Sequence, residues 1–186
     1  MVRAADLFEV NSANFKEITL EVFRYQAKNC AVYADYIKFL GRNPEKIDQI
    51  IDIPFLPIEF FKTKKVTAVP DETAIIFSSS GTTGMQQSAH YVHDLTLYNQ
   101  SFQKAFERFY GNPSEIAILA LLPSYLERTG SSLIYMVDAL IQQSKQPESG
   151  YFIHNFSDLH EALLSLKKKG KKTLLIGVTY ALLGYI

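Results

Sequence analysis

The sequence holds a single cysteine, Cys30, so no disulfide can form within the chain. Disulfides are rare in the cytosol, and a chain without one is expected to have a cytoplasmic location. An excess of one charge is also lacking, because 19 basic and 19 acidic side chains balance. Nucleic-acid-binding proteins usually carry a basic surplus, so the balance argues against a nucleic-acid partner.

Long apolar runs and an apolar leader segment are lacking too. The longest strongly apolar run covers 116–122, which is far too short to cross a bilayer. The first ten residues, MVRAADLFEV, contain no apolar core of a secretory signal. We therefore expect no membrane span and no secretion signal.

Apolar and aromatic residues are plentiful: they make up 47% of the chain, with 13 Phe and 11 Tyr. This content suffices for a sizeable core and excludes a disordered chain. Helical spacing of apolar residues predicts one helix over 14–41, ended by Gly41 and Pro44. Pro54 and Pro57 then predict an extended segment. We take 1–70 as a helical and proline-rich segment.

From residue 71 onward, strands alternate with helices. Asp94 is expected to cap a helix whose apolar stripe includes Phe106 and Phe109, whereas Ser157 should cap, and Gly170 end, a later helix. Alternation of this kind predicts an α/β fold with a mostly parallel sheet and crossover helices, on which the N-terminal segment packs. The predicted strands are 74–78, 88–94, 116–123, 151–155 and 173–178, of which we expect 74–78, 116–123 and 173–178 to be buried.

The stretch FSSSGTTG, at 77–84, lies between two of these strands and is rich in hydroxyls. Successive backbone N–H groups of small residues can converge on phosphate oxygens, and glycine allows the positive φ that this needs. No lysine follows Gly84 as in a Walker loop, and no dinucleotide-binding glycine motif is present. A flexible hairpin turn is the alternative. The predicted phosphate-binding residues are Ser79, Ser80, Gly81, Thr82, Thr83 and Gly84.

Several stretches in order resemble the adenylate-forming enzymes, and among them the acyl-protein synthetases of the LuxE type, also called long-chain-fatty-acid–luciferin-component ligases. The resemblance implies ATP and Mg²⁺ as cofactors and a carboxylic acid, such as a fatty acid, as substrate. The product would be an acyl-adenylate, whose acyl group passes to an acceptor protein or to CoA. The stretches are LEVFRYQAKNCAVYADYI, IPFLPIEFFKT, FSSSGTTG, LLPSYLERTGSSLIYMVDAL and LLIGVTYALL.

The sequence departs from the family pattern in ways that leave alternatives open. Where relatives continue with Pro-Lys after the loop, this chain has Gln86 and Gln87. The later acidic, ribose-binding and lysine motifs are expected beyond residue 186, so 71–186 is interpreted as part of a truncated N-terminal domain. Such a part would expose apolar surface that favours homo-oligomers. A phenylacetate–CoA-ligase-like acyl-CoA synthetase and a non-catalytic binding domain are the alternatives.

Further candidate residues follow the predicted strands, because ligands of open α/β sheets gather at the carboxyl ends of strands. A surface loop, a helix cap and a packed aromatic are the structural alternatives. His90 and His93 would point to opposite faces of a strand, so no metal site is expected. No catalytic residue is assigned. The candidate substrate-lining residues are Ser124, Tyr125, Gly130, Thr179 and Tyr180.

Overall fold

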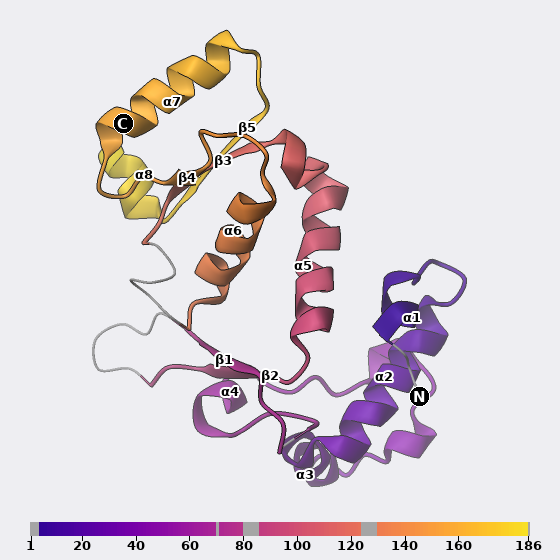
Figure 1. Cartoon of the computed structure of the whole chain (residues 1–186). Coiled ribbons are helices and arrows are strands. Elements are labelled where there is room, and N and C mark those ends of the chain that lie inside the picture. Colours follow the sequence, from indigo (N-terminus) through magenta and orange to yellow (C-terminus); the bar gives the residue numbers. More distant parts are fainter. Residues whose placement is uncertain (1–3, 70, 80–85, 124–129, 186) are drawn as a thin grey trace. The chain divides into compact units, whose positions relative to one another are not determined.

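The computed structural model describes residues 4–69, 71–79, 86–123 and 130–185 (Figure 1). It is a mixed α/β chain that divides into two compact units, Met1–Tyr98 and Asn99–Ile186. The division between the units falls within helix α5 (Leu95–Tyr110), and the strands that follow residue 70 form a hairpin that packs within the first unit. The division at residue 70 that the sequence indicates stays a prediction.

The first unit opens with helices, and its core lies between them. The predicted single helix over 14–41 is wrong, because Cys30 adopts an extended backbone (φ −97°, ψ 103°) between α2 and α3. The break is hidden in the sequence because apolar spacing continues through it. It sets the rings of Phe23 and Tyr33 edge to face, with centroids 6.1 Å apart. The helices are α1 (Ala4–Phe8), α2 (Phe15–Asn29), α3 (Ala31–Phe39) and α4 (Phe60–Thr63).

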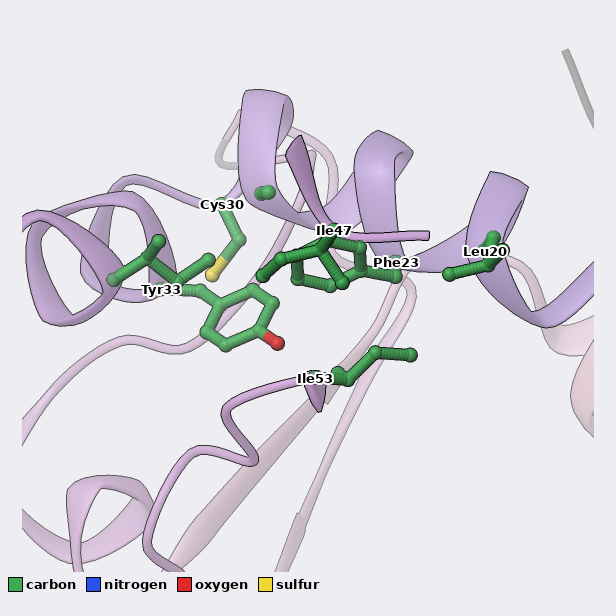
Figure 2. Close-up of a cluster of buried hydrophobic side chains, with 8 residues drawn as sticks. Leu20, Phe23, Cys30, Tyr33, Ile47 and Ile53 are labelled. Atoms are coloured by element: carbon green, nitrogen blue, oxygen red, sulfur yellow. The ribbon is translucent and has the colours of Figure 1, made fainter. Parts of the chain in front are cut away.

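The proline-rich segment covers this helical core. Two single 3₁₀ turns, Pro44–Lys46 and Ile50–Asp52, lead into it. The Tyr33 hydroxyl donates a hydrogen bond of 2.9 Å to the Pro54 carbonyl and fixes the segment to α3. Figure 2 shows the core side chains between the helices and the segment. Its buried members are Leu20, Phe23, Ala27, Cys30, Tyr33, Ile37, Ile47 and Ile53.

The first unit ends in an antiparallel hairpin of β1 (Ile75–Ser78) and β2 (Ala89–Val92). Both strands were expected from the sequence. The expectation that β1 is buried holds only for Phe77, because Ile76 keeps 46% of its surface exposed. A two-stranded sheet covered on one face has no second layer to bury the alternate side chains.

The second unit confirms the alternation of strands and helices. Its described residues form three parallel strands in the order β4-β3-β5, and β3 lies in the centre with every residue buried. The edge strand β5 is only half-buried, unlike the prediction. The further elements are β3 (Ala117–Leu121), α6 (Ser132–Gln143), β4 (Gly150–Tyr151), α7 (Phe156–Lys168), β5 (Thr173–Gly177) and α8 (Thr179–Tyr185), with a 3₁₀ turn at Pro113–Glu115.

Successive β3 side chains point to opposite faces of the sheet, and each face has its own helical layer. Ile118 packs with residues of α5 and α6. Leu119 packs with residues of α7 and α8. Two helical layers, one on each face of the sheet, therefore enclose the central strand, which explains why its sequence is apolar without alternation.

The ends of α5 and α7 test the helix caps that the sequence predicts. Asp94 caps α5 as predicted, since its carboxylate accepts bonds from the N–H groups of Thr96 and Leu97. The cap of α7 is Asn155, whose side chain accepts from the Asp158 N–H, so the prediction of Ser157 is wrong. Phe109, expected in the apolar stripe of α5, is 79% exposed. Among the described residues, no helix is long and apolar enough to cross a membrane.

Candidate functional site

The hydroxyl-rich segment connects β1 to β2, and two hydrogen bonds close its base. The Ser79 N–H donates to the Ser88 carbonyl at 3.1 Å, and the Ser88 N–H donates to the Ser79 hydroxyl oxygen at 3.0 Å. A serine hydroxyl that accepts one bond keeps its own O–H for a second partner. The other predicted phosphate-binding residues, Ser80, Gly81, Thr82, Thr83 and Gly84, lie outside the described residues.

Side chains on both strands of the hairpin contact other parts of the first unit. The buried ring of Phe77 lies against Tyr98, with centroids 5.0 Å apart. On the other strand, the Lys65 ammonium stands 5.5 Å from the centre of the Tyr91 ring, a cation–π contact. The two ends of the segment are therefore held at fixed positions relative to the first unit.

The chemistry of this segment suits an anion held by neutral donors. Between Phe77 and Tyr91 the sequence has no Asp, Glu, Lys or Arg. Opposite Phe77 in the hairpin is His90, and desolvation by the surrounding protein lowers its pKa below the usual value of 6.5 although part of the side chain is exposed. Its imidazole is thus mainly uncharged at pH 7. Backbone N–H groups and hydroxyls are the donors that remain for a phosphate.

To a divalent cation the segment 79–84 offers hydroxyl and carbonyl oxygens as ligands. Magnesium prefers carboxylates, phosphates and water, and the segment has no carboxylate. In the described part of the chain, no group of three or more His, Cys, Asp or Glu side chains could hold a metal ion. The hydroxyls and backbone N–H groups of this stretch are donors of the kind that bind phosphates without a charged side chain.

The second set of predicted residues lies at the carboxyl edge of the parallel sheet. Leu121 and Gly177 are register partners at the ends of β3 and β5, so the segments that follow both strands leave the sheet at one edge. Thr179 begins α8 and is exposed, and the Tyr180 side chain is 72% exposed. Tyr180 is thus not a packed aromatic, which was the structural alternative for it.

Of the other predicted substrate-lining residues, Gly130 has a local structural role. Gly130 has a φ of +79°, and the Ser131 hydroxyl oxygen after it accepts a bond from the Ile134 N–H at 3.4 Å. Gly130 therefore allows the turn that begins α6, whatever else it does. Ser124 and Tyr125 lie outside the described residues.

One polar group near this edge was missed from the sequence. The Tyr151 hydroxyl donates to Asp138 Oδ1 at 3.1 Å, and Gln142 donates to the other carboxylate oxygen at 2.6 Å. Burial, and then the charge of Asp138, raise the pKa of Tyr151, so its hydroxyl stays protonated and serves as a donor that links β4 to α6. The available signal was Asp138 itself, a lone charge within the apolar stretch SLIYMVDALI.

Comparisons of the chain with protein-family models, with curated proteins and with solved structures find no match. The fold defines a mixed α/β protein in which a hydroxyl-rich hairpin segment and the carboxyl edge of a small parallel sheet belong to different units.

Proposed function

We propose that segment 79–84 binds the phosphates of ATP in an ATP-dependent acyl-activating enzyme of the LuxE type, of which this chain is the N-terminal part. The observation that carries the proposal is the pair of hydrogen bonds between Ser79 and Ser88, which closes the segment at the end of an antiparallel hairpin. A connection anchored at Ser79 and Ser88 loses less conformational entropy on binding than a free chain, which favours anion binding by the residues between them.

The reaction would consume ATP and a carboxylic acid. A carboxylate oxygen attacks the α-phosphorus, the bond from that phosphorus to the bridging oxygen of the β-phosphate breaks, and pyrophosphate leaves. The acyl-adenylate then gives its acyl group to an acceptor protein or to the thiol of CoA. In this scheme backbone and hydroxyl donors of the segment hold the β- and γ-phosphates, which stabilises the charge that develops on the phosphate oxygens.

The substrate would lie at the carboxyl edge of the parallel sheet. The alignment of Leu121 with Gly177 supports this part of the proposal, because it brings the segments after β3 and β5 to one edge. The residues proposed to line the acyl substrate remain those predicted from the sequence: Ser124, Tyr125, Gly130, Thr179 and Tyr180.

The test is calorimetric titration of the chain with Mg²⁺–ATP and with a non-hydrolysable acyl-adenylate mimic. Replacing Gly81 with valine should weaken ATP binding by more than about tenfold, because a β-branched side chain restricts the backbone and crowds the phosphates. Gly184→Val is the matched control, since an added Cβ there meets no atom within 4 Å.

The proposal requires that ATP binding is kept in Gly184→Val and lost in a Gly81→Val protein with unchanged thermal stability. Wild-type protein that is folded yet binds neither ligand would overturn it. Equal ATP affinity of wild type and Gly81→Val would show that the segment is only a turn.

A further inference from the structure

A run of lysines surrounds the turn between α7 and β5, and neither the proposed nucleotide site nor the proposed substrate site uses it. Gly170, with a φ of +62°, ends α7, and the Lys171 N–H donates back to the Leu166 carbonyl at 3.0 Å. The lysines therefore project from a turn whose backbone is hydrogen-bonded, and all of their side chains are exposed. They are Lys167, Lys168, Lys169, Lys171 and Lys172.

Acidic side chains neutralise only a small part of this positive charge. Lys169 pairs with Glu148 at 2.6 Å, and this hydrogen bond lowers the pKa of the Glu148 carboxyl. The other four lysines form no ion pair within the described part of the chain. Four like charges so close together in sequence produce a positive potential that attracts anions.

Large apolar side chains are exposed beside these cations. The Lys172 ammonium donates a hydrogen bond to the Tyr110 carbonyl, which brings the lysines to the end of α5 (Figure 1). Phe109, in the last turn of α5, keeps 79% of its surface exposed. On α7, Leu164 is 55% exposed and lies one turn before Lys168, so these two side chains are neighbours on the helix surface. The surface thus combines positive charge with apolar groups in water.

We propose that this surface binds an anionic phospholipid bilayer as a peripheral contact. The four lysines without an ion pair attract the lipid phosphates, whereas Phe109 and Leu164 enter the boundary between head groups and acyl chains. Lysines next to aromatic and aliphatic side chains are the combination that binds at such a boundary. The inference does not depend on the proposed nucleotide site, because the two sets of residues do not overlap.

A single-stranded nucleic acid is the other polymer that offers phosphates together with apolar groups. Its bases bind by stacking on accessible aromatic rings. The Tyr110 ring already lies against Phe106, with centroids 5.0 Å apart, and Leu164 has no ring. The side chains beside the lysines therefore favour a bilayer over a nucleic acid.

The experiment is co-sedimentation of the whole chain with vesicles made of equal parts of phosphatidylglycerol and phosphatidylcholine. Vesicles of phosphatidylcholine alone present the same kind of interface without net charge. We expect the chain to bind the anionic vesicles, and to bind the neutral ones at least about tenfold more weakly. Added salt should weaken the binding, because it screens charges at an exposed surface.

Charge removal locates the binding. Each lysine near an anionic surface contributes about fivefold in affinity, so Lys167→Gln/Lys171→Gln should weaken vesicle binding by about tenfold or more. The matched control is Lys28→Gln/Lys38→Gln, which makes the same change of net charge at exposed lysines of α2 and α3. This control should bind as the wild type does.

Two apolar variants separate a bilayer from a nucleic acid. Phe109→Ser and Leu164→Ser change exposed side chains, so the fold is kept. Each should weaken vesicle binding by about threefold or more, because apolar area no longer enters the boundary region. Single-stranded oligouridine is the probe for nucleic acid, and stacking would require Phe109 but not Leu164.

Equal vesicle binding by the two lysine variants would overturn the proposal, as would equal binding of anionic and neutral vesicles. Folded wild-type chain that binds no vesicles would also overturn it. Binding of oligouridine without vesicle binding, lost in Phe109→Ser and kept in Leu164→Ser, would replace the bilayer with a nucleic acid. Gly81→Val should leave vesicle binding unchanged, which separates failure of this proposal from failure of the nucleotide site.

Discussion

Two strands with similar apolar sequences are buried to different extents in the two units. β1, IIFS, buries only Phe77, whereas β3, AILAL, is buried at every residue. The difference lies in their neighbours: β3 has a strand on each side and helices on each face, whereas β1 pairs only with β2 among the described residues. Apolar content thus identifies a strand, but the number of layers around it determines how much of it is buried.

The largest expected effect comes from truncating the same residue type in both strands. Ile118 in β3 is fully buried and Ile76 in β1 is 46% exposed. Ile118→Ala should lower the free energy of unfolding by about 2–5 kcal/mol, because it loses apolar burial and leaves a cavity. Ile76→Ala should lower it by less than about 1 kcal/mol. Urea denaturation of both variants measures this, and equal losses would contradict the comparison.

A smaller effect is expected where β3 and β5 meet. A Cβ added at Gly177 would lie 2.8 Å from the Cβ of Leu121 and 3.1 Å from its carbonyl oxygen. Gly177→Ala should therefore lower the free energy of unfolding by about 1–3 kcal/mol, since the two paired strands must move apart. Gly184→Ala, with no atom within 4 Å of the added Cβ, is the control and should not destabilise. Equal melting temperatures of the two variants would contradict this prediction, because they would show that the ends of β3 and β5 can move apart at no cost.

The cap of α7 offers a third comparison. Asn155 accepts the bond from the Asp158 N–H, whereas Ser157 lies inside the helix. Asn155→Ala should destabilise the protein by about 1 kcal/mol, and Ser157→Ala by clearly less. Chemical denaturation of the two variants decides between them, and a larger loss for Ser157→Ala would restore the prediction from the sequence.

The smallest effect concerns the charge of His90. Its pKa is lowered in the folded protein, so the unfolded chain binds the proton at a higher pH, near 6.5. The contribution of His90 to stability is therefore constant above this pH and decreases as the pH falls through 6.5 towards the folded-state pKa. His90→Gln should flatten this part of the stability profile. An unchanged slope between the two proteins would contradict the assignment.

Much of the second unit could be predicted from the sequence, for a physical reason. A strand enclosed by helices needs an uninterrupted apolar run, which is visible at 116–122. Glycines at helix ends were equally clear: Gly41 and Gly170 have φ of +65° and +62°. The prediction was wrong where two nearby residues had the same capping propensity. Asn155 and Ser157 are both good caps, and only the backbone decides between them.

The candidate site could be predicted only in part. The strands on both sides of segment 79–84 follow from their apolar and β-branched residues, but the bonds between Ser79 and Ser88 depend on the register of the hairpin. The break between α2 and α3 at Cys30 could not be predicted, because the apolar spacing continues through it. Asp138 and Tyr151 are 13 residues apart, and their bond depends on how α6 packs on the sheet.

The most direct measurement of the central claim is the change in backbone amide resonances when Mg²⁺–ATP is added to the isotope-labelled chain. The account predicts that the amides of Gly81, Thr82, Thr83 and Gly84 shift with one saturating curve, whereas those of α7 do not. If these four amides stay unchanged at saturating nucleotide, or only distant amides shift, segment 79–84 does not bind the phosphates of ATP.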